Sequence, residues 1–262
     1  MISKDHRFIF IHNPKTAGNS ITAFLLPYLS YEVFTNNEIG RSFTKEQMAE
    51  AEQFVKRVRF ALHLAADRPQ NRLLFDLQES VADMMGYQAD DSKKRIEAFM
   101  KQVYRMTLRI GEFNDMLLQS FEETVLKDPS DAIVTEINSR WRIRNQHLEL
   151  IHPNGFERHP SALLEAFVLL AQNPELKGLR ASTTRQMYTA RHLIDDAFRN
   201  DLVNISYFME LMRYPEKLPE VLRRMRYYGI LSRYIPEFGP IMGLMQHDLF
   251  HIYTVDAHTL QL

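Results

Sequence analysis

Residues 92–125 have the sequence SKKRIEAFMKQVYRMTLRIGEFNDMLLQSFEETV, in which apolar side chains recur at intervals of three and four positions. This interval places them on one face of an α-helix, because a helix completes a turn about every 3.6 residues. The apolar positions are Ile96, Phe99, Met100, Val103, Met106, Ile110, Phe113, Leu117 and Phe121. The stretch therefore predicts one long helix with an apolar face for other elements to cover.

Helical spacing recurs on both sides of this stretch. Thr44 to Gln47 form the capping box TKEQ at the start of a segment that extends to residue 66, and Gly86 ends a second segment, residues 73–85. Further helices are predicted at residues 160–172, 183–194, 200–213, 217–227 and 248–262, with a turn-rich stretch at 228–246. The sequence thus predicts a mainly α fold with a helical bundle-like domain.

Two places in the chain favour strands. Residues 133–151 alternate in polarity, which predicts a small central strand pair with a hairpin around Arg144-Asn145. Near the N-terminus, FIFIHNPKTAGNS (residues 8–20) predicts a buried strand of the parallel type at 7–12, a loop, and a helix at 20–29. No second strand–loop–helix unit follows, although a parallel sheet needs several. We therefore expect a lone N-terminal strand–loop–helix.

The N-terminal loop has features of an anion site. Backbone N–H groups at a helix N-terminus, the helix dipole and a lysine together attract phosphate. The motif FIHNPKTAGNSI resembles the sulfate-donor loop of sulfotransferases over about residues 6–42. That resemblance implies contacts with 3′-phosphoadenosine 5′-phosphosulfate from Lys15, Thr16, Gly18, Asn19 and Ser20. Asn13 departs from the pattern, and no later strand carries the Arg and Ser that would bind the 3′-phosphate. The alternative is a strand–turn–helix without a ligand.

Composition restricts the other classes of function. The chain has 262 residues, with 32 Lys and Arg against 33 Asp and Glu, and it has no Cys. Near-neutral charge argues against a nucleic-acid partner. The absence of Cys rules out disulfides and thiolate metal sites and fits a cytoplasmic protein. No apolar run approaches the roughly 20 residues that span a bilayer, so no membrane role is expected.

Three strings carry a second resemblance. They are VRFALHLAADRPQNRLLFDLQESVADMMGY (58–87), RIGEFNDMLLQ (109–119) and MRYYGILSRYIPEFGPIMGLMQHDLFHIYTVDAHTL (225–260). They resemble the bacterial PII uridylyltransferase/uridylyl-removing enzyme, a nucleotidyltransferase family in nitrogen regulation, over nearly all of residues 44–262. This resemblance implies the helical connecting region of the family at 43–246 and the first helix of a truncated HD-type hydrolase domain at 247–262, and the resemblance to sulfotransferases implies a separate segment at 1–42.

The same resemblance implies that both catalytic centres are missing. The Gly-Ser and Asp-x-Asp signature that holds magnesium ions in the family is absent from the sequence, and so is the His-Asp doublet of the hydrolase core. His247-Asp248 precedes the last helix and does not match that doublet. We therefore expect no catalytic residue, no cofactor in this chain, and no activity of the chain alone. Magnesium or another divalent metal would serve the full-length family.

One histidine matches a metal ligand of the family by position. His258 in VDAHT corresponds to the first metal-ligand histidine of the hydrolase domain. A single histidine cannot hold a catalytic metal, because further ligands and an open position for water are required. His247, His251 and His258 could share one helix face, so an adventitious zinc site is an alternative to ordinary packing.

Several hypotheses remain open from the sequence. The stretch RASTTRQMYTAR (180–191) could hold a phosphate, or it could be a helix cap with surface arginines. The chain is interpreted as a chimeric or truncated frame joined near residues 36–43, with PII as its partner by resemblance. The alternatives are a sulfotransferase-like enzyme, and a non-catalytic helical scaffold or subunit of a split enzyme that works with the missing domains in trans.

Overall fold

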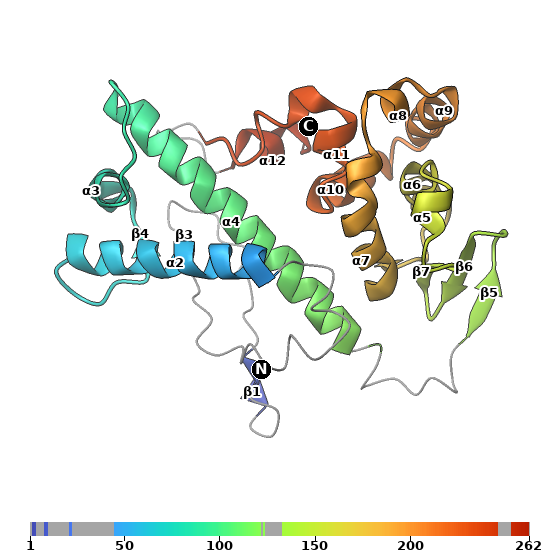
Figure 1. Ribbon diagram of the computed structural model, residues 1–262, viewed down its shortest axis with the longest axis horizontal. Coiled ribbons are helices and arrows are strands. Elements are labelled where there is room, and N and C mark those ends of the chain that lie inside the picture. Colours follow the sequence, from blue (N-terminus) through green and yellow to red (C-terminus); the bar gives the residue numbers. More distant parts are fainter. Residues whose placement is uncertain are drawn as a thin grey trace. The chain divides into compact units, whose positions relative to one another are not determined.

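The structure is a computed structural model that describes residues 2–3, 8–9, 21–22, 45–121, 123, 133–245 and 253–261 (Figure 1). The chain divides into two compact units. The first contains residues 1–110 and 241–259, and the second contains residues 111–240 and 260–262. The long helix α4 (Ser92–Phe121) contributes residues to both. Within the described ranges, no helix is both long and apolar enough to cross a membrane.

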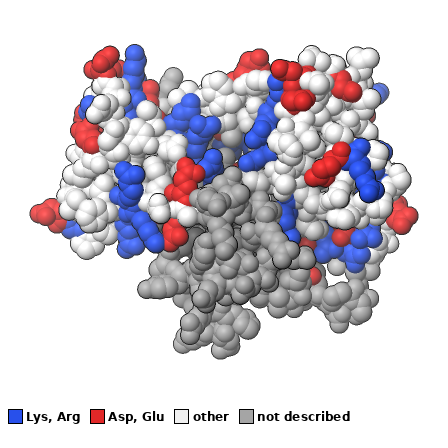
Figure 2. All heavy atoms as spheres, viewed as in Figure 1, with Lys and Arg blue, Asp and Glu red and all other residues white. Residues whose placement is uncertain are grey.

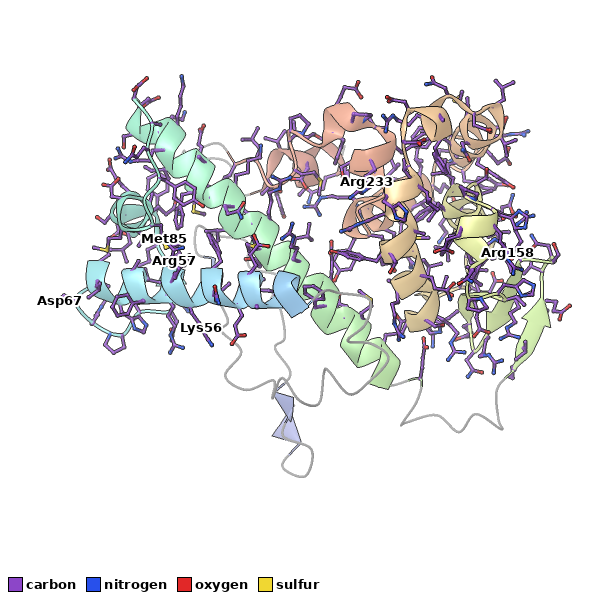
Figure 3. All side chains as sticks on the ribbon, in the orientation of Figure 1. Lys56, Arg57, Asp67, Met85, Arg158 and Arg233 are labelled. Carbon is purple, nitrogen blue, oxygen red and sulfur yellow. The ribbon has the colours of Figure 1, made fainter. Side chains whose placement is uncertain are left out.

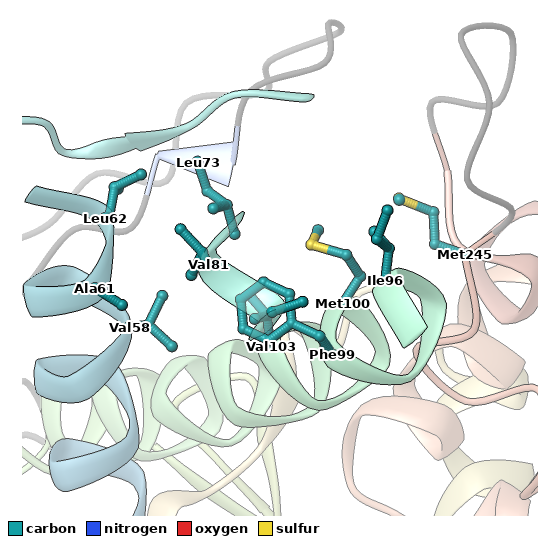
Figure 4. Packing of buried hydrophobic residues seen from close by; sticks show 11 residues of the cluster. Val58, Ala61, Leu62, Leu73, Val81, Ile96, Phe99, Met100, Val103 and Met245 are labelled. Atoms are coloured by element: carbon teal, nitrogen blue, oxygen red, sulfur yellow. The ribbon is translucent and has the colours of Figure 1, made fainter. Parts of the chain in front are cut away.

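The first unit packs helices around an apolar cluster. Its elements after the N-terminal strands are α2 (Lys45–Ala65), β4 (Arg72–Leu73), η2 (Phe75–Leu77), α3 (Gln78–Met84), the first part of α4, and α12 (Val255–Thr259). Figure 4 shows side chains from α2, α3 and α4 meeting one another. The buried cluster consists of Val58, Ala61, Leu62, Leu73, Val81, Ala82, Ile96, Phe99, Met100, Val103 and Met245.

Polar and aromatic contacts lie at the edges of this cluster. The Tyr104 hydroxyl lies 3.3 Å from the Met245 sulfur, and Tyr87 meets Phe99 edge to face at 5.4 Å between ring centroids. The buried Asp256 carboxylate accepts a 3.0 Å hydrogen bond from the backbone N–H of Gly243. Gly243 has a φ of +69°, a left-handed conformation that glycine adopts without strain. These contacts attach the segment after residue 240 to α4.

The second unit contains a four-stranded sheet and a set of shorter helices. The sheet order is β5 (Val134–Glu136), β6 (Trp141–Arg144), β7 (His147–Leu150) and β8 (Gly178–Leu179). The first three strands are antiparallel, and β8 pairs with β7 in parallel. Asn145 and Gln146 have φ values of +50° and +64°, as the two-residue turn of a tight hairpin requires. The predicted hairpin is thus confirmed, and the predicted strand pair is part of a larger sheet.

Helix α6 (Ala162–Gln172) occupies the interior of the second unit. Residues 162–171 are all buried, and α6 contacts α5 (Gly155–Arg158), α9 (Leu202–Leu211) and α10 (Leu218–Tyr227). The other elements are α7 (Ala181–Ala190), η5 (Arg191–Leu193), α8 (Asp196–Asn200), α11 (Leu231–Tyr234) and η6 (Pro236–Phe238). Such complete burial explains why α6 has the most apolar sequence of the predicted helices.

The mainly α prediction is confirmed, but three details of the N-terminal and C-terminal predictions need correction. Strand β2 (Phe8–Ile9) is neither lone nor parallel, because it pairs antiparallel with β1 (Ile2–Ser3). Only four residues separate these strands, and parallel pairing needs a connection of a dozen or more. Ile21–Thr22, predicted to begin a helix, form β3 and pair antiparallel with β4. The last predicted helix is described only as α12, which is shorter than residues 248–262.

Candidate functional site

The predicted donor-loop residues Lys15, Thr16, Gly18, Asn19 and Ser20 lie outside the described residues, as do His247 and His251. His258 lies on α12, is exposed, and donates its backbone N–H to the Thr254 carbonyl at 2.9 Å. Within the described parts of the chain, no group of three or more His, Cys, Asp or Glu is arranged to hold a metal ion. The predicted donor site and the predicted metal residue therefore stay predictions.

The most highly charged arrangement in the second unit surrounds Glu149 on β7. Arg142 is the cross-strand neighbour of Glu149 on β6, and its Nε donates to Glu149 Oε2. Arg144 Nε donates to the same oxygen at 3.0 Å, and Arg180 Nη1 donates to Oε1 at 2.8 Å. The Glu149 side chain is only 9% exposed, so its charge must be paired.

A second carboxylate, that of Glu123, extends this network. Arg180 Nε donates to Glu123 Oε2 at 3.0 Å, and the backbone N–H of Ala181 donates to Oε1 at 3.1 Å. Gln119 donates to the same carboxylate at 3.0 Å. Arg180, which precedes the first residue of α7, is thus held by two carboxylates. Arg180 is the first arginine of the stretch 180–191, and this pairing already satisfies its guanidinium. The pairing therefore counts against the hypothesis that the stretch holds a phosphate.

The network fixes the ionisation of Glu149. Burial pushes its pKa upward, but hydrogen bonds from Arg142 and Arg144 and the charge of Arg180 outweigh burial, so the pKa lies below its ordinary value. A carboxylate with a lowered pKa and three guanidinium partners is a poor proton acceptor. Glu149 is therefore suited to holding β6, β7 and α7 together rather than to acid–base chemistry.

Glu165 forms a second saturated cluster. It is the single charged residue of the apolar helix α6, and it is 6% exposed. Arg140 binds it in a bidentate manner at 2.8 and 2.6 Å, and the indole N–H of Trp141 donates to it at 2.8 Å. Asn138 adds a bond of 3.2 Å. The hydrogen bond with Glu165 raises the pKa of Arg140 more than burial lowers it. This cluster attaches the start of β6 to the interior helix.

A small pocket of about 100 Å³ lies between α4, α7 and α10. Its lining residues are Glu112, Asp115, Met116, Gln119, Thr184, Tyr188, Tyr227 and Tyr228. The Tyr227 hydroxyl donates to Asp115 Oδ2 at 2.5 Å. Burial, this hydrogen bond and the negative charges of Asp115 and Glu112 all raise the pKa of Tyr227. Tyr227 consequently stays protonated and serves as a hydrogen-bond donor between α10 and α4.

Sequence reasoning missed both saturated glutamates, although each left a signal. A single Glu inside the apolar run ALLEAFVLLAQ requires a buried cationic partner if that helix is interior. Once the turn is placed at Asn145-Gln146, the hairpin register puts Arg142 opposite Glu149 and Arg144 in the diagonal position two residues away. Neither signal reveals Arg140, Arg180 or Glu123, which approach from other elements.

Comparisons with known proteins match two consecutive parts of this chain. Residues 32–118 match the family model for GlnD PII-uridylyltransferase, and residues 141–234 match the model for the third domain of uridylyltransferase GlnD. This chain matches the GlnD uridylyltransferase family over most of its length. The first match begins inside the segment predicted to be sulfotransferase-like, and neither match reaches residues 6–31.

Individual GlnD relatives are closely similar. The bifunctional uridylyltransferase/uridylyl-removing enzyme of Pseudomonas aeruginosa is 52% identical over 215 residues, which is 82% of this chain and 24% of the relative. Its counterpart from Ectopseudomonas mendocina is 50% identical over 228 residues, which is 86% of this chain and 25% of the relative. The chain thus spans about a quarter of the length of these curated relatives. No solved structure matches it significantly.

Proposed function

We propose that this chain provides the helical connecting region of a bifunctional PII uridylyltransferase/uridylyl-removing enzyme of nitrogen regulation. The observation that carries this proposal is the pair of consecutive GlnD matches, at residues 32–118 and 141–234. Within the proposal, residues 43–246 are the connecting region and residues 247–262 begin a hydrolase domain. The enzyme would act in the cytoplasm on the PII signal protein.

In this role the chain is a scaffold and the chemistry belongs to other domains. The carboxylate of Glu149 is paired with three arginines, and that of Glu165 accepts hydrogen bonds from Arg140 and Trp141, which suits both to position helices and strands. The sequence has no Asp-x-Asp pair to hold magnesium. We propose that both catalytic centres, with their divalent metals, are supplied by domains outside residues 1–262, either on a longer chain or in trans.

The first test is an activity assay on the purified chain. We expect neither transfer of uridylyl groups from UTP to PII in the presence of magnesium nor removal of uridylyl groups from modified PII. The comparison is the full-length P. aeruginosa enzyme under the same conditions. Turnover by the chain above a no-enzyme control, in either direction, would contradict the scaffold role.

The second test is a chimera. Residues 44–245 of this chain replace the aligned segment of the full-length P. aeruginosa enzyme, and both activities are measured. At 52% identity the internal ion pairs and apolar cluster are transplanted together, so we expect activity within a few-fold of the parent. A matched control carries the same segment with Glu165→Ala, which breaks the buried cluster and should lower the yield of folded enzyme. A well-folded but inactive chimera would show that the segment does not serve as the connecting region.

A further inference from the structure

Two arginines of the second unit, Arg191 and Arg233, lie close together without a carboxylate between them. Arg191 begins η5, directly after α7, and Arg233 lies on α11. The guanidinium carbon of Arg191 lies 3.4 Å from the centroid of the Tyr188 ring. An aromatic face attracts a cation in this position, so Tyr188 holds the Arg191 guanidinium from one side.

Gly229 holds the Arg191 side chain from a second direction. Its φ is +69°, and a Cβ at this position would lie 2.7 Å from Arg191 Nη1, so a larger residue would displace the guanidinium. Helix α11 begins two residues after Gly229, and the Arg233 backbone carbonyl accepts a 3.0 Å hydrogen bond from Arg199 Nη1. The local fold therefore brings arginines from η5, α8 and α11 to one place.

The two guanidinium groups affect each other as like charges. Burial and the positive charge of Arg191 hold the pKa of Arg233 below its ordinary value, and the opposing effect of Tyr188 is smaller. Among the residues that the structure describes, neither Arg191 nor Arg233 forms an ion pair with a carboxylate. This differs from Arg140 and Arg180, whose charges are matched by buried glutamates.

The carboxylates near this arginine pair have other roles. Asp196 pairs with Arg199, and Asp195 accepts a 2.8 Å hydrogen bond from the backbone N–H of Phe198 at the start of α8. Glu237 lies on η6, beyond the end of α11, and forms no ion pair within the described ranges. The repulsion between the two guanidinium groups is therefore not offset by an acid of the described chain.

We propose that Arg191 and Arg233 together bind the phosphate group of a small phosphate or phosphate monoester. Such a group carries a charge of about −1.5 to −2 near neutral pH, which matches two guanidinium groups. Its oxygens can accept hydrogen bonds from two planar guanidinium forks at once. Arg191 is the last arginine of the stretch 180–191, and the site joins it to an arginine from outside that stretch.

A small anion fits the pair better than a polyanion does. A nucleic acid needs several basic side chains in a continuous track, because its affinity comes from many phosphate contacts. Figure 2 shows basic and acidic side chains interspersed over the face in view. Two neighbouring guanidinium groups within such a mixed surface can match a single phosphate group.

Arg158 provides a matched control in the same unit. It is the last residue of α5, it is exposed like Arg233, and it forms no ion pair among the described residues. Figure 3 labels Arg158 and Arg233 at separate places in the second unit. Arg158→Gln therefore removes one exposed guanidinium without changing the proposed site, and it separates phosphate binding from a general effect of charge.

The test follows the arginine Nε–H signals of the full chain by NMR during titration with inorganic phosphate or glycerol 3-phosphate, with sodium chloride keeping the ionic strength constant. We expect saturable shifts, and binding that weakens about tenfold in Arg233→Gln, because a charged hydrogen-bond donor is lost. Arg191→Lys keeps the charge but loses the planar fork, so it should also weaken binding. Arg158→Gln should leave the affinity unchanged.

Thermal unfolding gives a second readout of the same site. At low salt without phosphate, Arg233→Gln should not lower the Tm, because it removes a repulsion. Added phosphate should raise the Tm of the parent and of Arg158→Gln, since a ligand that binds the folded state stabilises it. The Tm of Arg233→Gln should rise less at the same phosphate concentration.

The two anions distinguish the sources of the phosphate group. Similar affinity for both supports a site that recognises the phosphate group itself, and tighter binding of glycerol 3-phosphate supports a site for an esterified phosphate. Absence of saturable shifts with either anion would overturn the proposal. Equal affinity of the parent and Arg233→Gln, or equal weakening by Arg158→Gln and Arg233→Gln, would overturn it as well.

Discussion

In the first unit, the cluster between α2, α3 and α4 consists of apolar side chains, whereas the second unit buries Glu149 and Glu165 against arginines. Apolar packing depends on shape and is indifferent to pH, while a buried ion pair depends on the ionisation of its carboxylate. The two units of one chain should therefore respond differently to cavities, to lost charges and to acid.

Phe99→Ala should be the most damaging single change. Phe99 is fully buried in the apolar cluster and lies edge to face with Tyr87, so its truncation leaves a cavity that costs about 3–5 kcal/mol. Hydrogen exchange measured by mass spectrometry should show lost protection in α2 and α4. A cost below about 1 kcal/mol would mean that the cluster does not hold the first unit together.

Glu165→Ala should cost about 3 kcal/mol or more in the second unit, because it leaves Arg140 and the indole N–H of Trp141 without their acceptor. Trp141 is the chain's only tryptophan, so its fluorescence during urea unfolding reports on this unit. The matched control is Glu175→Ala, which removes an exposed carboxylate and should stay within about 0.5 kcal/mol. Equal effects of the two substitutions would contradict the importance of the buried cluster.

Glu149→Gln should flatten the pH dependence of the second unit at a cost of about 1–3 kcal/mol at neutral pH. The folded-state pKa of Glu149 is lowered, so its contribution is present above the ordinary value of 4.5 and is lost as the pH falls through the folded pKa. Urea midpoints of the parent and the variant, followed by Trp141 fluorescence, should therefore converge below pH 4.5. Parallel pH profiles would show that Glu149 does not supply this dependence.

Glu79→Gln in the first unit should have the smallest effect. Its carboxylate lies 3.1 Å from Arg95, but the Glu79 side chain is 54% exposed, and such pairs contribute about 0–1 kcal/mol. Thermal unfolding should show a small difference in Tm between the parent and the variant at low salt, and no difference at high salt. A loss comparable to that of Glu165→Ala would mean that the first unit also depends on charge pairs.

The sequence predicted the regular parts of the fold well, because periodicity reports directly on burial. The long helix, the helix that became α6 and the hairpin around Asn145 all follow from spacing and turn chemistry. Strand β8 was missed because Gly178–Leu179 is too short to show a period and exists only through pairing with β7. Ile21–Thr22 were assigned to a helix because their pairing partner, β4, lies far along the chain.

The candidate site was harder to predict from the sequence than the fold. Its hairpin residues could be placed by register, but Arg180 and Glu123 come from separate elements whose approach is a tertiary event. The exposed side of α2 was harder still to predict, since Phe60 fits the helical segment without revealing that it is exposed. Only the burial of Val58, Ala61 and Leu62 shows which side of α2 faces outward.

An acid titration tests most directly the claim that buried charge pairs give the second unit a pH-dependent stability that the apolar cluster of the first unit does not have. Trp141 fluorescence follows the second unit, and hydrogen exchange of α2 and of the first half of α4 follows the first unit in the same samples. As the pH falls below 4.5, we expect the fluorescence to change before protection of α2 and α4 is lost. In Glu149→Gln the two changes should occur at more similar pH values. Unfolding of both units at the same pH, or unfolding of the first unit at a higher pH than the second, would contradict the account.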